Sequence, residues 1–167
     1  MVPKDSTAET LKDLKDQKIG IAGGPVDKSW LILRAYAEQE YGMDLASDTE
    51  QVFGAPPLIF KTALQGETGG VINFWHFAAK MKASGMRELI SVETAAMALG
   101  LDPDVPLLGY YFKGDFLASH PDLAQGFYEA SREAKALLAG EAAAWDAVRP
   151  MMNAKTDAQF EQLRADW

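Results

Sequence analysis

One stretch, residues 18–30, constrains the fold more than any other part of the chain. A short apolar run, Ile19–Ala22, ends at Gly23-Gly24-Pro25, and a helical pattern of apolar residues begins at Trp30. This order predicts a strand, a tight turn and the start of a helix, which is the repeating unit of parallel α/β sheets. In such sheets the turn lies at the carboxyl end of the strand, where ligands usually bind. The stretch therefore predicts one wall of a small-molecule site.

The residues of this turn suit a small polar or anionic ligand. Glycines let a ligand approach the backbone, and the start of a helix offers unpaired N–H groups with a partial positive charge. We therefore take Gly24, Asp27, Lys28 and Ser29 as candidate ligand-binding residues, with Ser29 first because its hydroxyl and N–H can both face an anion. For Asp27, Lys28 and Ser29 the alternative role is helix capping in a solvated turn. Dinucleotide and P-loop fingerprints are absent from this turn.

The same unit recurs along the next part of the chain. After a short helix over 8–16 and the first strand, the pattern predicts helices over 29–42, 57–65 and 75–83, and further strands over 49–53, 71–74 and 88–92. Residues 1–95 are thus expected to form a parallel α/β ligand-binding lobe with the order βαβαβαβ. The exits of the later strands add four candidate ligand-binding residues: Gly54, Asn73, Trp75 and His76. The alternative for Trp75 is packing between helix and sheet, and for His76 a surface or capping position.

The pattern changes after residue 95. A proline-punctuated stretch, 102–106, predicts a hinge, and it is followed by a strand over 107–113 and helices over 122–138, 141–152 and 156–166. Residues 96–167 are therefore expected to supply one returning strand and the C-terminal helices of an incomplete second lobe. Tyr110 is the candidate ligand contact from this lobe, although Tyr110 or Tyr111 is expected to enter the core because strand neighbours face opposite ways. The apolar stripes of the helices need a cover, which predicts self-association into a homodimer.

Composition excludes several other classes of function. The 167 residues carry a formal net charge of −8 without a long basic run, which argues against a nucleic-acid partner. The absence of cysteine excludes disulfides and thiol nucleophiles. No catalytic triad spacing, metal-binding histidine pair or supported carboxylate pair is present, so neither a catalytic residue, a metal nor a cofactor is predicted. No apolar run approaches the roughly 20 residues of a membrane span, and the polar residues 1–18 do not form a signal peptide.

Four segments in the same order resemble one family. They are similar to conserved stretches of ABC-transporter substrate-binding proteins of the nitrate/sulfonate/taurine and thiamine-precursor-like group, which have the type II periplasmic binding fold. The resemblance covers most of residues 11–138, but His76-Phe77 stands where the family has glutamate-proline, and Gly70 replaces an acidic residue. The segments are Asp13–Ile21 (DLKDQKIGI), Pro56-Pro57 with Ala63–Glu67 (ALQGE), Asn73–Lys80 (NFWHFAAK) and Tyr110–Pro121.

The resemblance implies a non-catalytic function, the binding of a solute. A solute would be captured by closure of two lobes and delivered to an ABC permease, from a periplasmic location. The resemblance also implies that the chain lacks the N-terminal part of the family's fold. Two other functions occur on this fold and stay open: an enzyme of the thiamine-pyrimidine-precursor type, and the ligand-sensing lobe of a LysR-type regulator.

Overall fold

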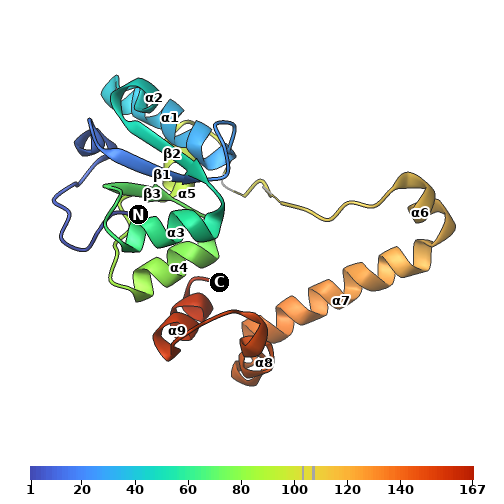
Figure 1. Ribbon diagram of the computed structural model, residues 1–167. Coiled ribbons are helices and arrows are strands. Elements are labelled where there is room, and N and C mark those ends of the chain that lie inside the picture. Colours follow the sequence, from blue (N-terminus) through green and yellow to red (C-terminus); the bar gives the residue numbers. More distant parts are fainter. Residues whose placement is uncertain (103, 107) are drawn as a thin grey trace. The chain divides into compact units, whose positions relative to one another are not determined.

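The computed structural model describes residues 1–102, 104–106 and 108–167, which form two compact units. The first unit comprises Met1–Pro103 together with Lys155–Trp167, and the second comprises Asp104–Ala154. Figure 1 shows the elements of both units, coloured along the sequence. Every candidate site residue except Tyr110 belongs to the first unit.

A parallel sheet forms the centre of the first unit. Its strands are β1 (Lys18–Ala22), β2 (Glu50–Gly54) and β3 (Gly70–Ile72), in the spatial order β2-β1-β3. Both neighbours run parallel to β1, which places Ala22 opposite Gly54 and Ile21 opposite Ile72. The predicted α/β class with a parallel sheet is confirmed.

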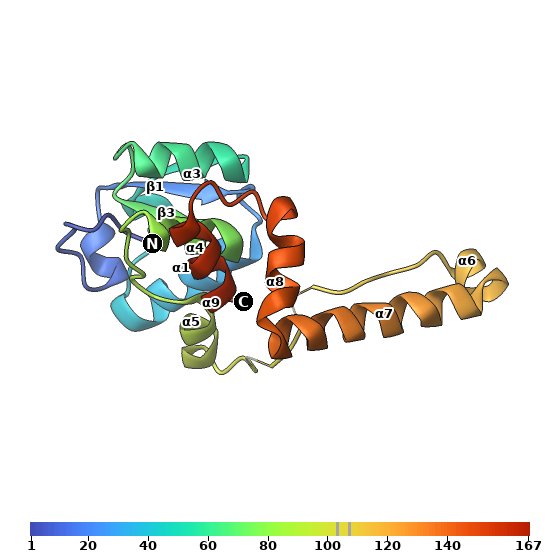
Figure 2. The same cartoon turned by 90° about the horizontal axis from the view of Figure 1, so that it is seen from below.

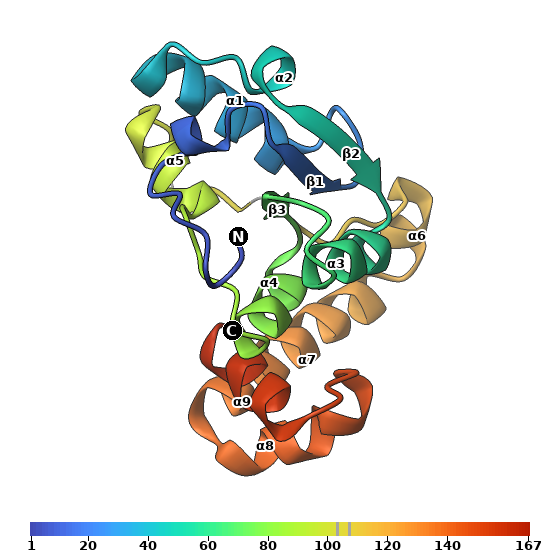
Figure 3. The ribbon, with the colours of Figure 1, turned by 60° about the vertical axis from the view of Figure 1, so that its left-hand side comes forward.

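Helices cover both faces of this sheet. In Figure 3, α1 and α5 lie on one side of the strands, and α3 and α4 lie on the other. Figure 2 shows α9 against α4, and the ion pair between Lys82 and Asp166, at 3.1 Å, joins α4 to the end of α9. The elements of the unit besides the strands are η1 (Leu11–Leu14), α1 (Lys28–Tyr41), α2 (Leu45–Asp48), α3 (Pro56–Leu64), α4 (Trp75–Ala83), α5 (Val92–Ala98) and α9 (Asp157–Ala165).

The central strand explains why the core has two parts. Alternate residues of a strand face opposite sides, so Ile19 and Ile21 enter the cluster beneath α1 with Trp30, whereas Ala22 joins the cluster beneath α3 and α4. Gly20 also faces α3, where a Cβ would lie 3.2 Å from Cγ2 of Ile59. Because β1 is buried on both faces, it reads in the sequence as an uninterrupted apolar run.

The first two residues occupy the outer edge of β3. Met1 and Val71 exchange two hydrogen bonds of 2.9 Å, one of them from the N-terminal amine, and Val2 pairs in both directions with Arg87 at 2.9 and 3.0 Å. This pairing explains why a fourth strand is absent from the described edge of the sheet. The described residues 88–92 do not form the predicted fourth strand, because Met1 already holds the edge of β3. Ser91 instead caps α5, and its hydroxyl accepts a hydrogen bond from the N–H of Thr94 at 2.9 Å.

Two smaller differences concern local capping. The predicted helix over 8–16 is only the 3₁₀ turn η1, because the carboxylate of Asp13 turns back to accept hydrogen bonds from the N–H groups of Glu9 and Thr10. Residues 43–48, between the predicted helix over 29–42 and the predicted strand over 49–53, contain α2, which Asp44 caps through the N–H of Ala46.

All the secondary structure that the second unit shows in its described residues is helical. It contains α6 (Gly114–Ser119), α7 (Pro121–Gly140), α8 (Ala142–Val148) and the 3₁₀ turn η2 (Arg149–Met151). The predicted strand over 107–113 is wrong, because the described residues 108–113 form no strand. Two residues of the predicted segments, Pro103 of the hinge and Leu107 of the strand, lie outside the described residues. The aromatic rings of Tyr110 and Phe112 contact Phe127 of α7 instead of entering a sheet. No helix in the described part of the chain has the length and apolarity needed to cross a membrane.

A substitution in the central strand tests this core. Ile21 is fully buried, so Ile21→Ala should lower the free energy of unfolding by about 2–5 kcal/mol through lost transfer energy and a cavity. The control Met97→Ala changes a side chain that is 48% exposed and should shift stability by no more than about 0.5 kcal/mol. Urea unfolding followed by circular dichroism measures both. Equal effects of the two substitutions would contradict the assigned core.

Candidate functional site

The exits of the three strands lie together because the strands are parallel. The N–H of Gly23, after β1, donates to the carbonyl of Gly54 at the end of β2, at 2.9 Å. The side-chain amide of Asn73, after β3, donates to the carbonyl of Pro56 at the start of α3, at 3.0 Å. The carboxyl edge of the sheet thus carries Gly24, Gly54 and Asn73, as the sequence predicts. We call this edge the strand-exit edge.

The glycines of this edge have different roles. Gly23 has a φ of +105°, a conformation that L residues rarely adopt, and so it makes the sharp turn after β1. A Cβ on Gly24 would have no neighbour within 4 Å, which leaves open space beside that backbone. A Cβ on Gly54 would lie 3.2 Å from Cδ1 of Ile59 and 3.3 Å from Cδ2 of Leu58. Gly24 therefore has room for a ligand, whereas Gly54 allows α3 to pack closely.

The start of α1 combines a capped N–H group with unused donors. The carboxylate of Asp27 accepts a hydrogen bond from the N–H of Trp30 at 3.1 Å, which is the capping role considered in the sequence analysis. Lys28 is exposed beside it. Ser29 is half-buried, and within the described chain neither its hydroxyl nor its N–H has a protein partner. Ser29 therefore keeps two groups available for a ligand.

The start of α4 is also left open. No side chain caps this helix in the described structure; the N–H groups of Phe77 and Ala78 donate to the carbonyl of Phe74, at 2.9 and 3.0 Å. Those of Trp75 and His76 have no acceptor among the described residues. Such N–H groups, reinforced by the helix dipole, attract negative charge or a polar oxygen.

Aromatic rings surround these donors. Phe74 is 46% exposed and Trp75 is 49% exposed, and their ring centroids lie 6.1 and 5.8 Å from that of His76. The exposure of Trp75 argues against the alternative that it packs between helix and sheet. Phe74 ends the strand predicted over 71–74, and for that reason it is absent from the predicted site residues. The signal that could have found it is the run Phe74–Phe77, which holds four aromatic rings in succession.

His76 lies in an environment that disfavours its charged form. The pKa of His76 is lowered below its ordinary value, mainly by partial burial. The positive charge of Lys80, one turn later on α4, is the second cause. Burial likewise lowers the pKa of Lys80, whose ammonium lies 5.7 Å from the ring centroid of Phe77. His76 is therefore a neutral imidazole at neutral pH, able to donate or accept a hydrogen bond.

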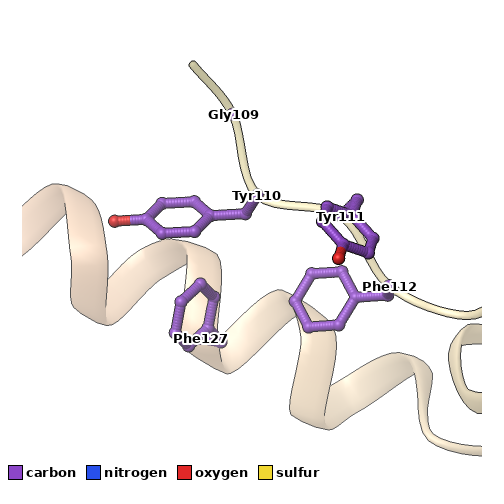
Figure 4. Close-up of a pocket in the computed structure, with 5 residues that line it drawn as sticks. All are labelled: Gly109, Tyr110, Tyr111, Phe112 and Phe127. Carbon is purple, nitrogen blue, oxygen red and sulfur yellow. The ribbon is translucent and has the colours of Figure 1, made fainter. Parts of the chain in front are cut away.

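Tyr110 belongs to the second unit and has contacts of its own there. Its ring is 63% exposed and meets Phe127 edge to face at 4.8 Å, and its hydroxyl is 3.2 Å from that of Ser131. Figure 4 shows Tyr110 and Phe112 next to Phe127 on α7, around a shallow hollow of about 220 Å³. This hollow is lined by Gly109, Tyr110, Tyr111, Phe112 and Phe127.

The chemistry available at the strand-exit edge is that of binding. It offers unpaired N–H groups at two helix starts, one unpaired hydroxyl, a neutral imidazole and two exposed aromatic faces. Among the described residues, no group of three or more His, Asp or Glu side chains could hold a metal ion. Such a set of donors and rings suits a small solute that has an anionic or polar head and an apolar or planar part.

Comparison with known proteins assigns the chain to a family. The model of the NMT1/THI5-like family matches residues 1–142, and the chain belongs to this family. The match agrees with the predicted resemblance to the nitrate/sulfonate/taurine and thiamine-precursor-like binding proteins, and it supports a fold of the periplasmic-binding-protein type. Proteins of this family are typically extracytoplasmic binding proteins. No curated protein matches the chain.

The two glycines of the first turn offer a matched pair of substitutions. Gly23→Ala forces a positive φ on a residue with a Cβ and should destabilise the fold by about 1–2 kcal/mol. Gly24→Ala places its methyl group in open space and should change stability by less than about 1 kcal/mol in either direction. Thermal and urea unfolding measure the difference. A Gly24→Ala variant that is as unstable as Gly23→Ala would show that the turn is assigned wrongly.

The environment of His76 predicts a titration and its sign. Because the pKa of His76 is lower in the folded than in the unfolded chain, the unfolded chain binds more protons between the two values. Stability should therefore fall as pH drops from about 6.5 toward the folded pKa. NMR titration of the imidazole in native and urea-unfolded protein measures both values. Lys80→Met removes the nearby positive charge and should raise the pKa of His76 in the folded protein. A pKa of His76 in the native protein at or above that in the unfolded protein would contradict the partly buried position of the imidazole.

Proposed function

We propose that this protein captures a small anionic or polar solute at the strand-exit edge, as the substrate-binding component of an ABC importer. The observation that supports it best is the pair of unused donor sets on one edge of the sheet: the hydroxyl and N–H of Ser29 at the start of α1, and the N–H groups of Trp75 and His76 at the start of α4. Membership of the NMT1/THI5-like family supports the same function.

Electrostatics favour an anionic or strongly polar head group. The strands are parallel, so α1, α3 and α4 all begin at the strand-exit edge and direct the positive ends of their dipoles toward it. Asp27 places one negative charge nearby, but its carboxylate is engaged with the N–H of Trp30. Lys28 adds a positive charge in the same turn. Nitrate, sulfonate, taurine and the phosphate of a pyrimidine precursor all have such a head.

The exposed rings favour a solute with a second, less polar part. Phe74 and Trp75 leave about half of their surfaces open beside the N–H groups of α4. An aromatic ring placed there can stack on a planar ligand or cover an alkyl chain. We therefore rank alkyl sulfonates and phosphorylated pyrimidines above nitrate as ligands.

An enzyme of the thiamine-precursor type is the alternative. One observation favours it: His76 has a lowered pKa and so can accept a proton at neutral pH. In the described part of the chain we see no nucleophile paired with this imidazole, and we therefore place solute capture first. Consumption of the bound solute would favour the enzyme.

Delivery to a permease and an extracytoplasmic location follow from the same proposal. A binding component of an importer meets its solute outside the cytoplasm and passes it to the membrane part of the transporter. An extracytoplasmic location is typical of the family, and we propose delivery to a permease together with it.

Mass spectrometry of material retained by the purified protein identifies the solute, and isothermal titration then measures its affinity. Ser29→Ala removes one hydrogen bond to a charged group and should weaken binding by about 10-fold or more. The control Ser47→Ala removes a hydroxyl that donates to the carbonyl of Asp44, away from the strand-exit edge, and should leave affinity unchanged. If Ser29→Ala binds as tightly as the unaltered protein, the strand-exit edge is not the binding site.

A further inference from the structure

Asn73 has a backbone partner at each end of its side-chain amide. The amide nitrogen donates to the carbonyl of Pro56 at 3.0 Å, and the amide oxygen accepts from the N–H of Phe74 at 2.9 Å. A carbonyl can only accept and an N–H can only donate, so these two partners fix which end of the amide faces which group. Asn73 therefore differs from Ser29, whose polar groups stay available to a solute.

The place of Asn73 in the sequence keeps it from capping α4. Asparagine is among the best capping residues, and a cap accepts from an N–H two or three residues later. In α4 the cap position holds Phe74, whose side chain has no acceptor, and Asn73 stands one residue earlier with its oxygen turned to the N–H of Phe74. The N–H groups of Trp75 and His76 are thus left without an acceptor among the described residues.

The start of α3 is suited to anchor this side chain. Its first two residues are Pro56 and Pro57, which have no N–H group. The next two N–H groups, those of Leu58 and Ile59, both donate to the carbonyl of Ala55, at 2.9 and 3.1 Å. In the described structure the start of α3 therefore has no N–H left for a solute, in contrast to α1 and α4. What it offers toward α4 is the carbonyl of Pro56.

We propose that Asn73 is a positioning residue of the strand-exit edge, which fixes the start of α4 against the start of α3 and does not itself contact the solute. The two helices already pack through the rings of Phe60 and Phe77, whose centroids lie 5.5 Å apart. The hydrogen bond from Asn73 extends this packing to the helix starts and holds the N–H groups of Trp75 and His76 in one orientation before a solute binds. This role rests on the proposed function, because the orientation matters only where these N–H groups meet a solute.

Backbone NMR relaxation of the protein without any solute tests the positioning. Asn73→Ala removes both hydrogen bonds, so the order parameters of the N–H groups of Trp75 and His76 should fall from about 0.85 toward 0.6. The control Gln39→Ala removes a side-chain amide that donates at the same distance, 3.0 Å, to the carbonyl of Ala98, and should leave these order parameters unchanged. Unchanged order parameters in Asn73→Ala would overturn the proposal, whether or not a solute binds.

Titration with benzenesulfonate, which joins an anionic head to a planar ring, separates positioning from contact. In the unaltered protein the backbone N–H signals of Trp75 and His76 should shift, whereas the side-chain amide signals of Asn73 should stay in place. Side-chain signals of Asn73 that shift as far would make this residue a ligand contact and overturn the proposal. If benzenesulfonate shifts none of these signals, the proposed function fails for this probe, and the relaxation measurement alone decides the role of Asn73.

Asn73→Asp gives a result that a purely structural role would not produce. The carboxylate keeps an acceptor for the N–H of Phe74 but loses the donor to Pro56, and its negative charge stabilises the start of a helix. Thermal unfolding should therefore show Asn73→Asp to be more stable than Asn73→Ala. Binding of benzenesulfonate should weaken about 3- to 10-fold in Asn73→Ala, and further in Asn73→Asp, whose charge repels the anion. Tighter binding by Asn73→Asp than by Asn73→Ala would mean that affinity only follows stability, and would overturn the proposal.

Discussion

Parallel pairing of β1 with a strand on each side is the constraint on which the structure depends. A parallel neighbour requires a crossover. In this chain α1 and α2 lie in the crossover from β1 to β2, and α3 lies in the crossover from β2 to β3. One face of the sheet is covered by α1 and α5, and the other by α3 and α4. The same pairing brings every strand exit and the next helix start to one edge. The position of the candidate site is therefore a consequence of strand direction, before any particular side chain is considered.

Hydrogen bonds tie the exits of the strand-exit edge to one another, although several of its donors are unused. Gly23 bonds to the carbonyl of Gly54, and Asn73 bonds to the carbonyl of Pro56, so each exit is tied to its neighbour. The N–H groups that remain, at Ser29, Trp75 and His76, stand on well-packed helices. Donors fixed in this way need little further ordering when a ligand binds, and this favours affinity for a small solute.

The sequence predicts the part of the fold that local patterns decide. The run Ile19–Ala22, the glycines after it and the stripe beginning at Trp30 give a strand, a turn and a helix that the structure confirms, and Trp75–Ala83 is a helix with the predicted bounds. The predictions fail where contacts with residues distant in sequence decide the local structure. Residues 88–92 have strand-like composition, but Met1 occupies the edge of β3 and Ser91 caps a helix. Likewise, Tyr110 and Phe112 pack on Phe127 and not in a sheet.

The sequence predicts the position of the candidate site better than the roles of its individual residues. Parallel strands sufficed to place Gly24, Gly54 and Asn73 on one edge. Sequence alone could not show that the carboxylate of Asp27 is used as a cap, that Gly54 serves close packing, or that Phe74 is exposed. These properties depend on which groups each side chain meets after folding.

We propose that the starts of α1 and α4 together form one ligand-binding edge. Amide NMR spectra recorded during titration with the solute identified by mass spectrometry test it most directly. The account predicts that the N–H signals of Ser29, Trp75 and His76 shift together, with one dissociation constant, while those at the amino ends of the strands stay in place. Shifts confined to other parts of the chain, or different dissociation constants at the two helix starts, would contradict it.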